Sequence, residues 1–271
     1  RQPRTRQIPP VANLPPPLTA APEDLARAAA LLRSGEIVAL PTETVYGLAA
    51  DALNPVALAK VFAAKGRPLV DPLIVHVADL AGLAQVAEPD SRLAKLAAFW
   101  PGPLTVVLHR RPIVPDLVTA GQSTVAVRIP SHPVFRAVLA QVGPLAAPSA
   151  NPFGYVSPTL AAHVRDSLGE RCPWVVDGGP CAHGVESTIL DLSSPDRVRL
   201  LRPGPIPRES LETALGGPVE VVERGSDAHV AQLAPGMLER HYSPRTPIRL
   251  FAHGAVPDIP PAHAALLLQS R

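Results

Sequence analysis

Short apolar runs alternate with helix-forming segments over residues 22–215, and proline or glycine closes almost every one of them. Apolar residues at helical spacing predict helices such as Glu23–Arg33, whereas continuous apolar runs such as Ile37–Leu40 predict buried strands. Strands interleaved with helices favour an α/β sheet covered by helices, and two hairpin-like stretches make it a mixed sheet. The predicted strands are 37–40, 72–77, 104–108, 124–129, 145–147, 174–176, 187–192 and 198–201.

Length and charge exclude several classes of protein. A chain of 271 residues is long enough for one large domain, or for one domain and a small appendage. Its net charge of +2 is far from that of a dedicated nucleic-acid binder. Cys172 and Cys181 have neither CxxC spacing nor a disulfide framework, which excludes a structural zinc site and a disulfide-stapled secreted domain. No apolar run spans a membrane and no signal-peptide pattern opens the chain, so we expect a cytoplasmic protein.

The 35 prolines divide the chain unevenly. Residues 1–21 read as an extended Pro-rich tail in which Arg1, Arg4 and Arg6 are expected to be solvated, although phosphate contact is an alternative. The ordered domain is expected over residues 22–210 and a turn-rich linker over 211–247. Residues 248–271 are too few to fold alone and read as the start of a truncated second domain, or as a tail packed on the first.

Polar segments punctuated by glycine and proline follow the predicted strands, where ligands bind in open α/β sheets. Residues 41–48 carry two hydroxyls, a carboxylate and a phenol, which suit either a polar substrate or an ordinary turn. The glycines of 177–179 permit close backbone approach to a ligand, or simply a turn. In the same region Glu186, Ser187 and Thr188 could hold a polar ligand or a metal.

Cations in two further segments point to anion binding. Lys65 and Arg67 share a short turn that suits a polyphosphate, although Lys65 also suits the last turn of a helix. Arg128 ends an apolar alternation and therefore forms either an internal salt bridge or a clamp for a ligand carboxylate. His76 lies in a predicted strand and is either a core residue or a ligand contact.

Ser149 and Ser157 are candidate helix caps, and a helix N-terminus is also an anion site. No GxSxG elbow surrounds Ser149, which argues against a serine hydrolase. The chain contains no P-loop, no GxGxxG and no HExxH motif. A nucleotide would therefore be bound without the standard loops.

Taken in order, these segments resemble those of a known family. The segments are PTETVYGLAADA, KGRP with PLIVH, WPGPLT, VAVRIPSHP, APSAN with SPT, DGG with GVESTILD, and LRPG. They are similar to those of the threonylcarbamoyl-AMP synthase family over residues 22–210, and APGMLERHYSP resembles the linker of its two-domain members. The resemblance implies a twisted, open mixed sheet with a large concave, positively lined cavity, followed by an irregular linker.

The resemblance also implies an activity. Enzymes of this family are nucleotidyltransferases that make L-threonylcarbamoyladenylate from L-threonine, bicarbonate and ATP, with release of pyrophosphate. Mg²⁺ would arrive with ATP, with no metal site of the protein's own. Other proteins then transfer the threonylcarbamoyl group to tRNA beside the anticodon. We therefore expect ATP, threonine, bicarbonate, tRNA and those transfer proteins as partners, and no membrane.

Roles for individual residues follow from the resemblance. Lys65 and Arg67 would be catalytic, and His241 and Tyr242 of the linker would close over the site. The threonine contacts would be Thr44, His76, Arg128, Ala147 through its backbone, and Ser187. The ATP contacts would be Lys65, Arg67, Asp71, Thr124, Ser149, Ser157 and Arg202.

Two residues depart from the family pattern, and two rival functions remain. Asp71 stands where the family commonly has Asn, which places a negative charge near phosphates, and Phe153 replaces a small residue and could narrow the pocket mouth. One rival is an RNA-binding module without catalysis, which would bind RNA tightly and release no pyrophosphate. The other is carbamoyl transfer from carbamoyl phosphate, whose enzymes carry zinc-type or kinase-like domains that this chain lacks.

Overall fold

The computed structural model describes residues 14–222, 232, 234 and 235. The predictions for Arg1, Arg4, Arg6, His241, Tyr242 and residues 248–271 lie outside the described residues. The helices are α1 (Pro22–Arg33), α2 (Pro55–Lys65), α3 (Leu80–Val86), the 3-10 helix η1 (Ser91–Phe99), α4 (Asp116–Thr119), α5 (Pro133–Val142), α6 (Ala161–Leu168), the 3-10 helix η2 (Gly169–Arg171) and α7 (Arg208–Leu215). The strands are β1 (Val38–Leu40), β2 (Gly47–Asp51), β3 (Ile74–His76), β4 (Leu104–His109), β5 (Thr124–Arg128), β6 (Leu145–Ala146), β7 (Thr188–Asp191), β8 (Arg199–Arg202) and β9 (Glu220–Val221).

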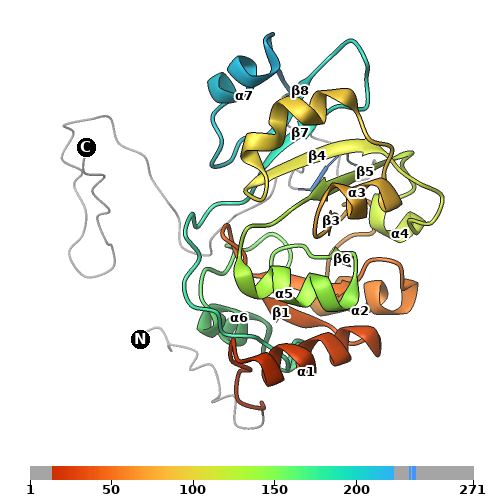
Figure 1. Cartoon of the computed structure of the whole chain (residues 1–271). Coiled ribbons are helices and arrows are strands. Elements are labelled where there is room, and N and C mark those ends of the chain that lie inside the picture. The colour runs from red at the N-terminus through yellow and green to blue at the C-terminus, as the bar shows by residue number, and fades with distance from the viewer. Residues whose placement is uncertain (1–13, 223–231, 233, 236–271) are drawn as a thin grey trace, which may run out of the picture.

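The strands form one mixed sheet, as the sequence predicted. Its order is β1-β2-β6-β3-β5-β4-β7-β8-β9. The pairs β3–β5, β4–β7 and β8–β9 are parallel and the other neighbours are antiparallel. In Figure 1, α1 and α6 lie at one end of the domain and α7 lies at the other. Since β9 extends the sheet, the described domain continues past residue 210, where we had expected a linker.

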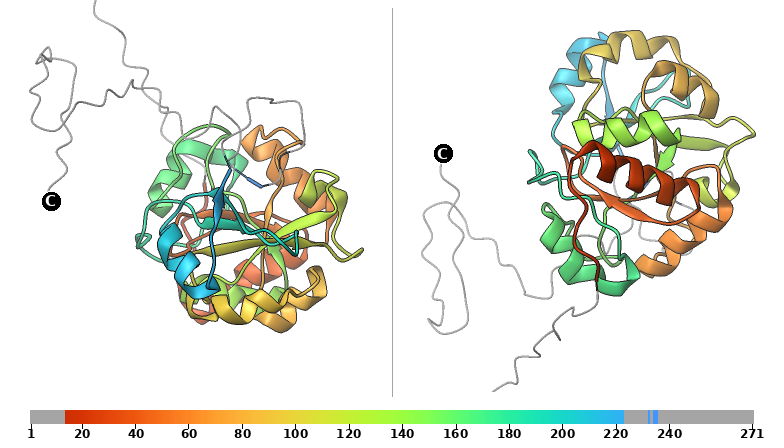
Figure 2. Two further views of the ribbon diagram at one scale, coloured as in Figure 1. Left: turned by 90° about the horizontal axis from the view of Figure 1, so that it is seen from above. Right: turned by 60° about the horizontal axis from the view of Figure 1, so that its bottom comes forward.

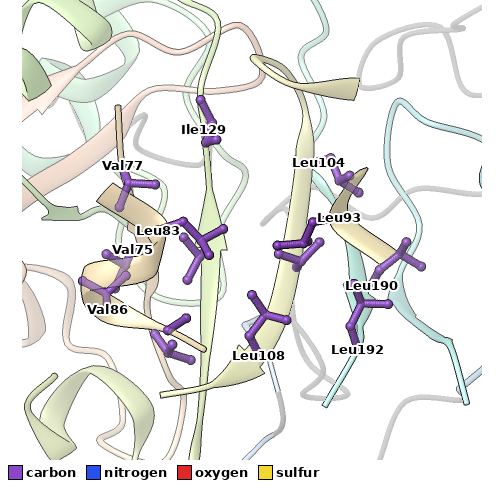
Figure 3. Close-up of a cluster of buried hydrophobic side chains, with 14 of the residues drawn as sticks. Val75, Val77, Leu83, Val86, Leu93, Leu104, Leu108, Ile129, Leu190 and Leu192 are labelled. Atoms are coloured by element: carbon purple, nitrogen blue, oxygen red, sulfur yellow. The ribbon is translucent and has the colours of Figure 1, made fainter. Parts of the chain in front are cut away.

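One face of the central strands carries a large apolar core. The alternation of β5 turns Val125 and Val127 toward this core, together with Leu104, Val106 and Leu108 of β4. Helices α3, η1 and α7 cover it. Figure 3 shows Leu83 and Val86 of α3 and Leu93 of η1 among the side chains of the strands. Burial of this many aliphatic side chains is the main force holding the helices on the sheet.

Among the described residues, the opposite face of the same strands is only thinly covered. It presents the apolar side chains of Ile74, Ala126 and Leu201. The strands that carry these side chains end in polar residues. Ala234 packs directly on this apolar patch and is fully buried. Ala234 therefore lies on the face that the described helices leave open.

The other end of the sheet is covered on both sides. Helices α1 and α5 pack together on one face of β1 and β2, as Figure 2 shows, and α2 and α6 pack on the other. Leu18 also joins the first of these clusters and donates its N–H to the Val175 carbonyl at 2.8 Å. The prediction of a solvated tail is therefore wrong at Leu18, because its side chain completes the core beside α1.

Local sequence signals set the bounds of α2, the helix that leads into the site. The Asn54 side chain accepts hydrogen bonds from the N–H groups of Val56 and Ala57, and Pro55 occupies the first turn. Gly66 ends the helix at φ 62°, a left-handed conformation that favours glycine. Lys65 is thereby held at the last turn, directly before the loop that contains Arg67. Within the described part of the chain, no helix is both long and apolar enough to cross a bilayer.

Candidate functional site

A pocket opens on the thinly covered face, where β3 and β5 end side by side. Its atom-free space is about 470 Å³, open solvent included. His76 from β3 pairs in register with Arg128 from β5, and both line the pocket. Thr44, before β2, and Ser187, before β7, complete its polar wall. Segments more than 140 residues apart in the chain therefore converge on one hollow, as the strand-end argument predicted.

Arg128 is held from three sides. Its Nη2 donates to the Glu43 carboxylate at 2.7 Å, its Nη1 to the Thr44 hydroxyl at 3.0 Å, and its Nε to the Gly102 carbonyl at 3.3 Å. The alternatives for Arg128 were an internal salt bridge or a ligand clamp, and the structure shows the salt bridge on a side chain that still lines the pocket.

The electrostatics of the Arg128–Glu43 pair follow from its burial. Burial lowers the pKa of the Arg128 guanidinium, and the charge of Glu43 opposes this change. Burial also acts to raise the pKa of Glu43, but the charge and hydrogen bond of Arg128 outweigh it and leave that pKa below its usual value. Glu43 is therefore ionised at neutral pH.

Two other arginines of the pocket also have carboxylate partners. Arg67 lies 2.9 Å from an Asp71 oxygen, and Arg202 pairs with Glu186. All three arginines are less than 10% exposed. The arginines that line the cavity are therefore paired with carboxylates, which reduces the positive charge of the lining that the resemblance implied.

The hydrogen bonds of Lys65, among the described residues, all go to the loop after β6. Its Nζ donates to the backbone carbonyls of Ser149 at 2.5 Å and Asn151 at 2.6 Å. The Asn151 side-chain oxygen lies 3.4 Å away. Burial and the nearby charge of Arg67 lower the pKa of Lys65 to about 7. Lys65 thus fixes the Ser149–Asn151 loop against the end of α2.

The loop of Arg67 is fixed mainly by backbone contacts. Its Nε donates to the Asp71 carbonyl at 3.0 Å and its Nη2 to the Pro72 carbonyl at 2.6 Å. The Asp71 side chain is fully buried, and neither of its carboxylate oxygens accepts a hydrogen bond within the described residues. Burial raises the pKa of Asp71, and Arg67 opposes that rise. The unusual aspartate is thus tolerated through an ion pair with its neighbouring arginine.

Ser187 lies at the centre of a buried hydrogen-bond network. Its Oγ is 2.8 Å from the Thr105 Oγ1 and accepts from the Arg202 Nη2 at 3.0 Å. Arg202 also donates to the Pro235 carbonyl at 3.2 Å, and Pro235 lines the pocket. This arginine therefore links Ser187 to Pro235 across the wall of the pocket.

The sequence left open whether His76 is a core residue or a ligand contact, and in the structure it is a buried residue that also lines the pocket. It is 2% exposed and its ring packs 5.0 Å from that of Phe135, yet it lines the pocket. Its Nδ1 has no hydrogen-bond partner among the described residues. Burial and the charge of Arg128 lower the pKa of His76 to about 3, so the ring is neutral at pH 7.

Comparison with known proteins shows which family the chain belongs to. The family model for Sua5, YciO and YrdC proteins, described as telomere recombination, matches residues 30–204. A second model, the C-terminal domain of threonylcarbamoyl-AMP synthase, matches residues 206–264. A Mycobacterium tuberculosis relative, "Putative threonylcarbamoyl-AMP synthase", is 37% identical over 68% of this chain and 86% of its own length. The chain belongs to the threonylcarbamoyl-AMP synthase family.

Longer relatives within the threonylcarbamoyl-AMP synthase family are more similar still. The "Threonylcarbamoyl-AMP synthase" of Bacillus subtilis is 47% identical over 83% of this chain, which spans only 66% of that relative's length. The solved structure titled "Crystal structure of P. abyssi Sua5 complexed with L-threonine" is 40% identical, with a TM-score of 0.80 over 85% of this chain and 69% of that one. Escherichia coli YciO, at 20% identity and a TM-score of 0.64, shares the fold.

Most of the residues to which the family resemblance assigned a role line the pocket. They are Thr44, Arg67, His76, Arg128, Ala147, Ser149, Ser187 and Arg202. Lys65 and Asp71 do not line the pocket but contact residues that do. Lys65 bonds the Ser149 carbonyl, and Asp71 pairs with Arg67. Thr124 lies at the far end of β5 from Arg128, outside the lining but on the same face of the strand. Its role therefore remains a prediction.

The predicted helix caps are wrong. No helix begins at Ser149 or Ser157, since α6 starts at Ala161. Instead the Ser157 hydroxyl donates to a Glu186 carboxylate oxygen at 2.9 Å. Phe153 does not line the described pocket, and its N–H donates to the Lys65 carbonyl at 2.8 Å.

The glycines after Asp177 form a turn that packs against other parts of the protein. The Gly179 carbonyl accepts from the Tyr46 hydroxyl at 2.8 Å, and a Cβ on Gly178 would lie 2.6 Å from Pro41. The close backbone approach that these glycines permit is therefore to other parts of the protein. Sequence reasoning offered Glu43 only as part of a segment that suits a polar substrate or a turn, and it gave no role to Thr105. The partners of both residues lie more than 80 residues away.

Proposed function

We propose that the chain synthesises L-threonylcarbamoyladenylate from L-threonine, bicarbonate and ATP, with release of pyrophosphate. One observation carries this proposal: the five residues assigned to threonine by resemblance converge on one pocket, beside Arg67, Ser149 and Arg202. The names of the relatives and the threonine complex of the Pyrococcus abyssi protein support the same reaction.

The pocket suits an amino acid. The described contacts of Arg128 use three of the five N–H donors of a guanidinium, which leaves two for a substrate carboxylate. Val45 and Ala147 provide apolar surface for a methyl group. The neutral ring of His76 and the Ser187 hydroxyl can bond a polar substrate without adding charge.

The chemistry needs positioning more than a nucleophilic side chain. The threonine amine and bicarbonate condense to a carbamate with loss of water. A carbamate oxygen then attacks the α-phosphorus of ATP, the bond between the α-phosphorus and the bridging oxygen breaks, and pyrophosphate leaves. Because both reactants are anions, Lys65, Arg67 and Arg202 serve to bring them together and to neutralise charge.

Mg²⁺ is proposed to enter with the phosphates of ATP. Among the described residues, no three His, Cys, Asp or Glu side chains are grouped as a metal site, so the ion would be held mainly by phosphate and water oxygens. Glu186 is the lining carboxylate that could add an oxygen ligand. When bound, Mg²⁺ would neutralise the charge on the transferred phosphate.

The product is proposed to serve tRNA modification beside the anticodon, in the cytoplasm, after transfer by other proteins. A purely RNA-binding module is not favoured. Arg67, Arg128 and Arg202 line a pocket and are buried, so they can meet a small anion inside it, whereas nucleic-acid binders expose their cations on the surface to the phosphate backbone.

Pyrophosphate release tests the proposal. The protein is incubated with ATP, Mg²⁺ and bicarbonate, with threonine or serine as the amino acid. We expect release to depend on threonine, with less release from serine, which lacks the methyl group. Arg128→Ala should abolish threonine binding and keep ATP binding. Folded protein that binds RNA tightly and releases no pyrophosphate would overturn the proposal in favour of the RNA-binding module.

A further inference from the structure

We propose that Glu43 is a positioning residue for threonine, which acts by holding the Arg128 guanidinium in the orientation that receives the substrate carboxylate. This inference rests on the proposed function. Glu43 is 7% exposed and is not among the residues that line the pocket, whereas its partner Arg128 is. We therefore assign the effect of Glu43 on threonine to its contact with Arg128.

Both carboxylate oxygens of Glu43 are occupied. Oε1 accepts from Arg128 at 2.7 Å and Oε2 accepts from the Ser131 N–H at 3.2 Å. The Glu43 carbonyl is itself anchored, since it accepts from the His183 N–H at 2.9 Å. The carboxylate is therefore a fixed point, tied to the loop after β5 and to the loop before β7.

Arg128 needs such a fixed point. A long arginine side chain loses much rotamer freedom when it is held in one conformation, and a buried guanidinium without a counter-charge is strongly disfavoured. The remaining described contacts of Arg128, to the Thr44 hydroxyl and the Gly102 carbonyl, are longer than the contact to Glu43 and carry no charge. Glu43 thus provides both the counter-charge and the shortest hydrogen bond of this side chain.

The charge of Glu43 also has an opposing effect, which makes the inference testable. A negative charge behind Arg128 weakens the attraction of its guanidinium for a substrate carboxylate. If orientation dominates, removal of the charge weakens threonine binding, and if charge dominates, removal strengthens it. The proposal commits to orientation, because a fork of two donors bonds a carboxylate well only in a fixed geometry.

Glu43→Gln removes the charge and keeps the side-chain length. Glu43→Asp keeps the charge but shortens the reach, and it covers the case in which the Gln variant does not fold. Asp191→Asn is the matched control, because Asp191 is also buried, also pairs with an arginine (Arg199) and also accepts a backbone N–H (Ser193), yet lies outside the pocket lining.

The full chain is titrated with L-threonine and, separately, with ATP. We expect Glu43→Gln and Glu43→Asp each to raise the Kd for threonine tenfold or more. The Kd for ATP should change less than twofold, and kcat at saturating threonine less than threefold. Asp191→Asn should leave both Kd values within twofold of wild type. An unchanged or lower threonine Kd in either Glu43 variant overturns the proposal, as does an equal rise in Asp191→Asn. A wild-type protein that neither binds threonine nor releases pyrophosphate overturns the proposed function itself.

Discussion

The ammonium nitrogen of Lys65 lies 2.6 Å from the backbone carbonyl oxygen of Asn151, so the last turn of α2 and the loop after β6 are joined by a buried cation. The same nitrogen bonds the Ser149 carbonyl. One side chain thus determines where Ser149 and its neighbours lie relative to Arg67. The phosphate role expected for Lys65 and this structural role are compatible, because a fixed loop is what positions a bound nucleotide.

Lys65→Met should lower the free energy of unfolding by about 1–3 kcal/mol, since the buried Asn151 carbonyl loses its described donor and the Ser149 carbonyl keeps only the Asn151 N–H. It should also reduce pyrophosphate release by at least tenfold. Lys60→Met is the control, because Lys60 lies in the same helix but pairs with Glu36 at the surface, where an ion pair contributes about 0–1 kcal/mol. Urea unfolding and the pyrophosphate assay measure both effects. Equal losses in the two variants would contradict the role given to Lys65.

Asp71→Asn should tighten ATP binding about three- to tenfold, equivalent to roughly 0.7–1.4 kcal/mol. The substitution removes a buried negative charge that is paired with Arg67, and so leaves that guanidinium free to attract phosphate. We expect Arg67 to stay in place, because its hydrogen bonds to the backbone carbonyls of Asp71 and Pro72 do not involve the side chain of Asp71. Calorimetric titration with ATP measures the effect, and Asp116→Asn, at the exposed pair with Arg110, is the control. Weaker or unchanged ATP binding in Asp71→Asn would contradict the expectation.

The neutral His76 ring should make the fold sensitive to acid. Its folded pKa of about 3 lies below the ordinary value of 6.5, so the unfolded chain binds more protons between these two pH values. The contribution of His76 to stability is therefore present above pH 6.5 and is lost as the pH falls toward 3, by up to about 1.4 kcal/mol per pH unit. Denaturant unfolding between pH 7 and pH 4 should show a shallower loss in His76→Gln than in wild type. Parallel curves would show that the buried ring does not carry this effect.

Gly204 packs against the backbone that carries Ser187. A Cβ at this position would lie 2.3 Å from the Thr188 nitrogen and 2.6 Å from the Glu186 carbonyl oxygen. Gly204→Ala should therefore cost about 1–3 kcal/mol of stability or more and weaken threonine binding, because the backbone at Ser187 must move. Gly217→Ala is the control, since nothing lies within 4 Å of a Cβ there. Thermal unfolding and threonine titration compare the two, and a Gly204→Ala chain that behaves like the control contradicts the close packing.

The sequence predicted the central strands well because their side chains alternate or run apolar without interruption. Arg128 was singled out because a charge at the end of the apolar strand β5 needs a partner or a wet cleft, and the structure provides both. Strand β2 was not predicted, and its first two residues fall in the segment interpreted as either a substrate contact or a turn. Its Gly-Leu-Ala-Ala-Asp run has little strand propensity of its own and becomes a strand only through pairing with β1 and β6.

Other features depended on contacts that are distant in the chain. Ser157 followed by proline looks like a helix start, and only the fold brings Glu186 to its hydroxyl. The predicted strand at 174–176 forms only isolated bridges, to Leu18 and Ala39, which are distant from it in the chain. The partner of Arg128 was likewise invisible, because nothing in the spacing of residues 43 and 128 shows that they meet.

The most direct test of the account measures two products at once. The protein is supplied with ATP, Mg²⁺, L-threonine and isotopically labelled bicarbonate, and the label found in an adenylate is compared with the pyrophosphate released. The account predicts one labelled carbon in the adenylate for each pyrophosphate, and neither product without threonine. Pyrophosphate released without label in an adenylate, or released without threonine, would contradict the claim that one pocket joins the carbamate of threonine to ATP.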